Sequence, residues 1–147
     1  MKIVVAYDGS DGSRLALAQA IELTGGSDNE LIIAGIREPV VSFQYTGIGS
    51  SKGDQNLSEK GELTLAEIQE RLEKEANSKW DEILDVAKQQ CKEAGVKCRV
   101  IYEIGTPRTK LCDIAQNEEA ELVVVGSRGF GAIKRLFLGS VRDRKSV

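Results

Sequence analysis

The chain has 147 residues, of which 41% are hydrophobic and 29% are charged. This length suffices for one globular domain, and this composition excludes a disordered chain. The absence of histidine excludes a Ser-His-Asp triad, a Cys-His pair and histidine-ligated zinc. An odd number of cysteines with no Cys-x-x-Cys spacing argues against a disulfide scaffold, so we expect reduced thiols in or near the core at Cys91, Cys98 and Cys112.

Charge and hydropathy limit the classes of partner. No apolar run approaches the roughly 20 residues that span a bilayer, and the run after Met1 is too short for a signal peptide. These features favour a cytoplasmic protein without membrane contact. The net charge of −3 argues against nucleic acid as a partner. Residues 126–147 nevertheless carry six basic side chains and one acidic one, which suggests a local anion site.

The first predicted elements are a strand and a helix. Residues 2–7 are apolar at nearly every position, as in strands that are covered on both faces of a parallel sheet. The turn cluster at 8–13 supplies N-cap residues for a helix. We assign the inner face of this helix to apolar residues at helical spacing, namely Leu15, Ala18, Ile21 and Leu23.

A Thr-Gly-Gly sequence at 24–26 ends this helix, and a second buried strand is expected at 30–36. Residues 37–60 are rich in Gly, Ser, Gln and Asn and show no clear period. Because this segment is too long for an ordinary connection, it is either a functional loop or a mobile insertion, and we favour the insertion.

One long helix is predicted over residues 62–94, followed by a C-cap glycine at Gly95 and a strand over 96–104. The strand places Val96, Cys98, Val100 and Tyr102 on one side. The helix carries an apolar stripe with steps of three and four residues: Leu65, Ile68, Leu72, Ala76, Trp80, Ile83, Ala87, Cys91 and Ala94.

The last clear elements are a short helix and a strand. Thr106 is expected to cap the helix and Pro107 suits its first position. Its inner face comprises Leu111, Ile114 and Ala115, and a fourth strand follows at 121–125. The alternation of strands and helices predicts a single α/β domain with a parallel sheet and helices on both faces. Ligands of such sheets bind beyond the carboxyl ends of the strands, where the strand order reverses.

A glycine-rich segment follows the fourth strand. Gly126 and Gly129 leave backbone N–H groups accessible to an anion, and Gly139-Ser140 is expected to open another helix. Arg128 adds positive charge, so these parts together suit a di- or triphosphate. A Walker A loop is excluded, because Gly131 is not followed by Lys-Ser/Thr. The alternative is that these glycines only shape turns, and we prefer phosphate binding.

The spacing Gly126, Gly129, Gly139-Ser140 matches the G-2x-G-9x-G-S/T motif, and the chain resembles the nucleotide-binding branch of the universal stress protein family. The start at 3–10 and Gly105-Thr106-Pro107 resemble that family too, so the likeness covers the whole chain in order. It implies a Rossmann-like sheet with strand order 3-2-1-4, a homodimer, and binding of ATP, ADP or AMP, with Mg²⁺ carried by the nucleotide.

The resemblance also implies a cofactor site, with no catalytic residue and no protein metal ligand. Asp8 would contact the ribose, Ala6 and Tyr7 would flank the adenine, and Ile36 would touch the base. The strand-one loop, including Ser10, would face the nucleoside. The phosphates and ribose would be held by the glycine-rich segment, at Gly126, Arg128, Gly129, Gly139, Ser140 and Val141. From the residues alone, Asp8 is nearly as well explained as a helix-capping turn residue.

One departure from the family is expected at the C-terminus. After Ser140 too few residues remain for a full helix and a fifth strand, so we expect the fifth strand to be missing and the dimer mode to be altered.

Three functions are compatible with these features. The first is an adenine-nucleotide-binding sensor or regulator of the stress response. The second is a slow, metal-assisted ATP hydrolase, against which stands the lack of histidine and of a clear general base. The third is a dimeric assembly module that binds no nucleotide. We favour the first, with at most weak ATPase activity.

Overall fold

A computed structural model of the chain describes residues 1–25, 28–40 and 64–126. The predicted strands and helices within these ranges are all present, with ends that differ from the prediction by up to three residues. The element expected to begin at Gly139-Ser140 and most of the segment 37–60 lie outside the described residues. In chain order the elements are β1 (Lys2–Ala6), α1 (Asp11–Thr24), β2 (Glu30–Arg37), α4 (Leu65–Glu93), β3 (Cys98–Ile104), α5 (Pro107–Asn117) and β4 (Leu122–Val124).

The four strands form one parallel sheet in the order β3-β2-β1-β4, as predicted. Val4 of β1 is paired with Ile32 of β2 and with Val123 of β4, so β1 is central. The chain proceeds from β1 to β2 on one side and later returns to β4 on the other. The strand order therefore reverses beside β1, and the carboxyl end of β1 is the place where such sheets bind ligands.

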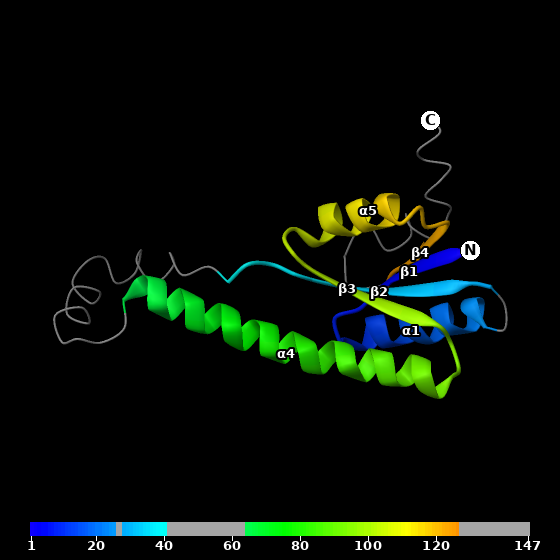
Figure 1. Ribbon diagram of the computed structural model, residues 1–147, viewed down its shortest axis with the longest axis horizontal. Helices are drawn as coiled ribbons and strands as arrows, with labels where there is room; N and C mark the ends of the chain where they lie inside the picture. The colour runs from blue at the N-terminus through cyan, green and yellow to red at the C-terminus, as the bar shows by residue number, and fades with distance from the viewer. Residues whose placement is uncertain (26–27, 41–63, 127–147) are drawn as a thin grey trace. The chain divides into compact units, whose positions relative to one another are not determined.

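Helices cover both faces of this sheet (Figure 1). On one face α5 packs over a fully apolar cluster, and its residues Leu111, Ile114 and Ala115 are buried as predicted. On the other face α1 and the C-terminal part of α4 pack over a second cluster. The strands alternate between the two clusters, because successive side chains of a strand point to opposite faces. Val96, Cys98, Val100 and Tyr102 pack against the second cluster, as the sequence predicts.

The predicted inner face of α1 is wrong for three of its four residues, whereas Ile21 is partly buried and packs against the second cluster as predicted. Leu15 is 71% exposed and Leu23 is 51% exposed, and Ala18 also faces solvent. The buried residues of α1 are instead Ser13, Ala16, Leu17, Ala20 and Thr24. Small residues on this face let the helix approach the sheet closely, and Leu17 is the large side chain that fills the remaining space. The position of the apolar residues in the sequence therefore gives the wrong face for this helix.

The long helix α4 follows its predicted stripe in part. Ala87 and Cys91 are buried as expected, but Ala94 is exposed and the buried Leu84 was not predicted. Leu84 of α4 packs directly on Gly35 of β2, where a Cβ would lie 2.8 Å from a Leu84 methyl carbon. Gly35 thus makes room for the helix.

Contacts group the chain into two compact units, Met1–Glu38 with Trp80–Val147, and Pro39–Lys79. The first unit contains the sheet, α1, α5 and the C-terminal part of α4. In the second unit, Glu73 accepts a hydrogen bond of 2.8 Å from the Val40 N–H, and the Gln69 amide donates to the Val40 carbonyl at 2.6 Å. The single domain expected over residues 1–147 stays a prediction.

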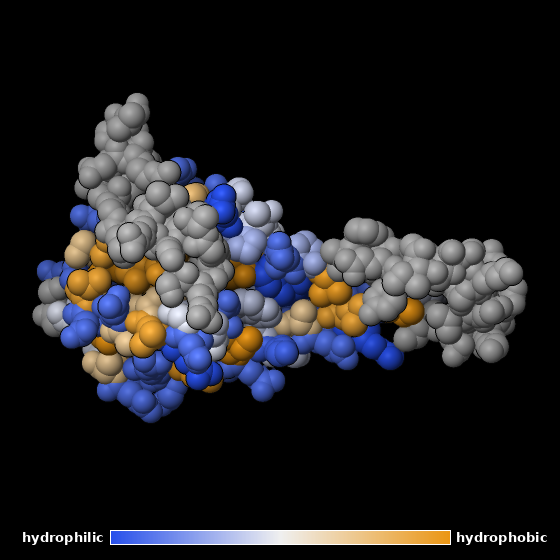
Figure 2. Space-filling model, turned by 180° about the vertical axis from the view of Figure 1, so that it is seen from behind, coloured by the Kyte–Doolittle hydropathy of each residue, from blue (hydrophilic) through white to orange (hydrophobic). Residues whose placement is uncertain are grey.

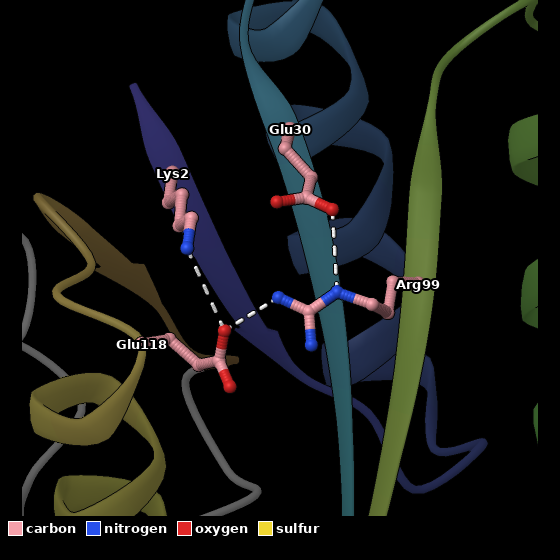
Figure 3. Close-up of polar contacts among 4 residues, drawn as sticks. All are labelled: Lys2, Glu30, Arg99 and Glu118. Carbon is pink, nitrogen blue, oxygen red and sulfur yellow. Dashed lines mark hydrogen bonds and ion pairs between the residues drawn. The ribbon is translucent and has the colours of Figure 1, made fainter.

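The amino ends of three strands are joined by a polar network (Figure 3). Arg99 of β3 donates to Glu30 of β2 at 3.2 Å and to Glu118, which directly follows α5. Lys2 of β1 lies 3.7 Å from the same Glu118 carboxylate. These four side chains are 21–43% exposed, so the network lies at the surface. It ties the sheet to α5 at the edge opposite the expected ligand site.

Hydrophobic residues on the coloured surface in Figure 2 alternate with hydrophilic ones. No helix among the described residues combines the length and the apolar character needed to cross a membrane.

Candidate functional site

The loop after β1 is fixed by serine hydroxyls. The Tyr7 N–H still donates to the Ala34 carbonyl at 2.9 Å, so the pairing of β1 with β2 persists to the start of the loop. Ser10 is the N-cap of α1, and its hydroxyl accepts a hydrogen bond of 3.3 Å from the Ser13 N–H. The Ser13 hydroxyl donates back to the Ser10 carbonyl at 3.0 Å. This reciprocal pair holds the first turn of α1 and the preceding residues in one conformation.

Asp8 is held by this loop with its side chain exposed to solvent. The Ser10 N–H donates to Asp8 Oδ1 at 2.9 Å. Burial raises the pKa of Asp8, but hydrogen bonds from Ser10 and Ser13 outweigh it, and the pKa lies below the ordinary value. Asp8 is therefore a carboxylate at neutral pH, which is an acceptor for ligand hydroxyl groups. The helix-capping role that the sequence left open belongs to Ser10 instead.

Gly126 brings the segment after β4 against this loop. It is buried, and a Cβ at this position would lie 2.5 Å from the carbonyl carbon of Gly12 and 2.9 Å from the Ser13 nitrogen. Backbone atoms cannot yield to a side chain at such distances. Gly126, two residues after β4, is therefore packed directly on the first turn of α1. Arg128, Gly129, Gly139, Ser140 and Val141 lie outside the described residues.

A pocket of about 220 Å³ opens at the carboxyl ends of β1 and β2. Three of the predicted site residues, Tyr7, Asp8 and Ile36, line it. Three other described site residues, Ala6, Ser10 and Gly126, are not among its lining residues. Ala6 belongs to the cluster beneath α5, Ser10 caps α1, and Gly126 packs on the first turn of α1. The remaining lining residues are Ala34, Arg37, Glu38, Trp80 and Pro107.

Arg37 is a pocket residue that sequence reasoning missed. It is only 5% exposed, although it is charged. Its Nε donates to the Tyr102 hydroxyl at 2.7 Å, and one terminal nitrogen donates to the Glu38 carbonyl at 3.1 Å. A charged residue at the end of an otherwise apolar strand is the signal that could have found it, because buried charges need dedicated partners.

Trp80 is a second missed residue, because it fits the apolar stripe of α4 and was assigned to the core. It is half-buried, it lines the pocket, and its ring lies 6.0 Å from that of Tyr102 with an interplanar angle of 34°. As the sole tryptophan of the chain, it could have been considered for a ligand pocket from the sequence.

The pocket suits a nucleoside better than a metal ion. Its walls combine apolar and aromatic side chains with two exposed acidic residues, Asp8 and Glu38, and the buried Arg37. The apolar and aromatic walls match a planar base, and the carboxylates are acceptors for sugar hydroxyl groups. Among residues 1–25, 28–40 and 64–126, no group of three or more Cys, Asp or Glu residues is placed to hold a metal ion. A second pocket of about 270 Å³ also borders Tyr7 and Asp8 and is further lined by Gly9, Arg14, Glu82, Ile83 and Val86.

Comparisons with known proteins agree on one family. The model described as the universal stress protein family matches residues 1–144. Universal stress protein YxiE of Bacillus subtilis is 35% identical over 147 residues, covering 99% of this chain and 90% of its own. A universal stress protein crystallised in complex with cAMP superimposes with a TM-score of 0.60 at 26% identity, covering 99% of this chain and 87% of its own. The structure of hypothetical protein MJ0577 of Methanocaldococcus jannaschii superimposes with a TM-score of 0.64 at 18% identity, covering 97% of this chain and 85% of its own. It therefore shares the fold.

Proposed function

The chain belongs to the universal stress protein family, and on that premise we propose that it binds an adenine nucleotide and acts as a sensor or regulator in the stress response. The observation that carries the proposal is the pocket at the carboxyl ends of β1 and β2, with the ionised Asp8 at its border. The relative that was crystallised with cAMP gives independent support for an adenine nucleotide.

In the proposed complex, Asp8 accepts hydrogen bonds from the ribose hydroxyls, and Tyr7 and Ile36 flank the base. Gly126 is packed on the first turn of α1, which begins three residues after Asp8 in the chain. The sequence motif assigns the phosphates to this segment, at Gly126, Arg128, Gly129, Gly139, Ser140 and Val141. We propose ATP, ADP or AMP as the ligand, with Mg²⁺ arriving on the nucleotide.

We propose binding and not catalysis as the main role. A general base works best with a pKa near the operating pH, whereas the pKa of Asp8 is lowered. The slow hydrolase therefore remains the less favoured alternative. Nucleotide occupancy would instead bias a conformation or an assembly that a partner reads. We further propose a cytoplasmic homodimer; the nucleotide-free assembly module is the alternative if no nucleotide binds.

The substitution Asp8→Asn tests the ribose contact. Loss of the charged acceptor is expected to weaken AMP and ATP binding about ten-fold or more, because hydrogen bonds to charged groups contribute roughly 1.5–3 kcal/mol. Asp11→Asn is the matched control, since Asp11 is an exposed aspartate in the first turn of α1, three residues after Asp8. Equal affinities of Asp8→Asn and wild type in titration calorimetry would show that the ribose does not lie at Asp8.

A further inference from the structure

We propose that Trp80 is a further base-contacting residue of the pocket at β1 and β2, beside Tyr7 and Ile36, and that Arg37 and Tyr102 position its indole. The pocket therefore selects purine over pyrimidine nucleotides. The inference rests on the proposed nucleotide binding. It adds that Trp80 recognises the base of the nucleotide.

The location of Trp80 favours a ligand contact over a purely structural role. It is half-buried, and it lines the pocket together with Tyr7 and Pro107. Its other neighbours belong to the apolar cluster beneath α1 and α4, which anchors the indole on the protein side. An indole that is packed on one side and borders a cavity on the other offers a flat apolar surface to a planar ligand.

The position of the indole is fixed by a relay through three elements. Tyr102 of β3 packs on Trp80 of α4, with ring centroids 6.0 Å apart. Its hydroxyl accepts the 2.7 Å hydrogen bond from Arg37 of β2. Arg37 is nearly fully buried and also donates to the Glu38 carbonyl, so the guanidinium is an ordered donor. The phenol ring is thereby held against the indole, and no rotamer change is needed when a base binds.

The size of the pocket indicates which part of the nucleotide enters it. A volume of about 220 Å³ is below the roughly 300–1,000 Å³ of pockets that enclose a whole drug-sized ligand. A base fits, and the sugar then lies at Asp8, which borders the same pocket. A purine covers more of an indole face than a pyrimidine does, and stacking is tolerant of which purine is present. The structure thus assigns preference for purines, and not discrimination between adenine and guanine, to Trp80.

The first test uses the fluorescence of Trp80, which is the sole tryptophan and reports the pocket without a label. Titration of the full chain with AMP is expected to change the Trp80 emission with the same midpoint as the calorimetric isotherm, and GMP should do likewise. CMP is expected to bind about ten-fold more weakly or worse. Calorimetric AMP binding with no change in Trp80 emission would overturn the inference.

The second test compares variants by calorimetry. Trp80→Leu is expected to lose about ten-fold or more in AMP affinity and most of the preference over CMP, whereas Trp80→Phe keeps an aromatic face and most of both. Tyr102→Phe removes the acceptor of Arg37 and should cost about three-fold. Lys88→Ala, at an exposed position of the same helix, is the control and should bind like wild type. A preference for AMP over CMP that Trp80→Leu leaves unchanged would overturn the inference.

Failure of this inference can be told apart from failure of the proposed function. If folded wild-type protein binds neither AMP nor ATP, the proposed function and the role of Trp80 both fail. If wild type binds AMP and Asp8→Asn weakens it, but Trp80→Leu does not, only the role of Trp80 fails. Circular dichroism of each variant tests whether a loss of binding arises from a loss of fold.

Discussion

Asp8 couples the loop after β1 to pH. Its folded-state pKa is lowered, so its contribution to stability is present above its unfolded pKa and is lost as pH falls through the folded value. Asp8→Asn is therefore expected to be slightly less stable than wild type at pH 7, by no more than about 0.5 kcal/mol for this exposed group. The difference should shrink as pH falls below about 4 and vanish once Asp8 is protonated in the folded state as well. Urea unfolding at pH 7 and pH 3 measures both values, and a difference that grows in acid would contradict the sign.

Cys91 differs in burial from the other two cysteines, so we expect it to differ from them in reactivity. Burial, together with the neighbouring Cys98, raises the pKa of the Cys91 thiol to about 12. Cys91 is also fully buried, whereas Cys98 and Cys112 are half-buried. A thiol reagent at pH 8 is expected to label Cys98 and Cys112 of the folded protein first and Cys91 only on unfolding. Mass spectrometry of labelled peptides checks the order, with Cys91→Ala as the control; rapid native labelling of Cys91 would contradict it.

Two helices end in the same cap with different residues. At the end of α4 the Val96 N–H donates to the Cys91 carbonyl at 3.0 Å, and Gly95 has a φ of +73°. At the end of α5 the Ala120 N–H donates to the Ala115 carbonyl at 2.9 Å, and Glu119 has a φ of +55°. Both are Schellman caps, in which glycine is the preferred residue at positive φ. The exposed Glu119 therefore carries backbone strain that Gly95 avoids.

This pair predicts opposite effects of two substitutions. Glu119→Gly is expected to raise the free energy of unfolding by about 0.5–1 kcal/mol, because glycine has no Cβ and adopts a positive φ without steric strain. Gly95→Ala is expected to lower it by about 1 kcal/mol. A Cβ on Gly95 meets no atom within 4 Å, so the loss is conformational and not steric. Denaturant unfolding gives both values, and the same sign for both variants would contradict this interpretation.

Elements differ in how far their sequence predicts them. The strands follow from continuous apolar runs, which are typical of a sheet that is covered on both faces, whereas their order is implied only by the resemblance to the family. The face of α1 does not follow, because close packing on the sheet selects the small Ala16 and Ala20 and leaves Leu15 outside. In the site, Tyr7, Asp8 and Ile36 follow from the resemblance to the family, whereas the residues alone indicate only that ligands bind beyond the carboxyl ends of the strands. Arg37 of β2 and Trp80 of α4 line the same pocket. They lie far apart in the chain, so no local sequence pattern predicts that they come together.

At the scale of the whole molecule, the network of Arg99, Glu30, Glu118 and Lys2 ties β1, β2, β3 and α5 together at the edge opposite the pocket (Figure 3). Hydrogen bonds from Arg99 lower the pKa of Glu118, which keeps this carboxylate ionised at neutral pH. Because these side chains are partly exposed, solvent screens the interaction and its contribution is modest.

Arg99→Gln is expected to lower the free energy of unfolding by about 0.5–1 kcal/mol at low salt and by less in 1 M NaCl. Nucleotide affinity should stay unchanged, because the network lies at the amino ends of the strands. Lys110→Gln is the control and should cost less, since among the residues that the structure describes Lys110 forms a single exposed pair, with Glu103 at 3.7 Å. Equal unfolding free energies for Arg99→Gln and Lys110→Gln would contradict the cooperative role of the network.

Nucleotide binding is the central claim, and titration calorimetry of the ligand-stripped 147-residue chain with ATP and with AMP, each with and without Mg²⁺, tests it most directly. We predict saturable binding of one adenine nucleotide per chain, with Mg²⁺ strengthening the binding of ATP more than that of AMP. If folded protein gives no heat of binding in calorimetry and binds no nucleotide in equilibrium dialysis, nucleotide binding is contradicted. That result would favour an assembly module that works without nucleotide.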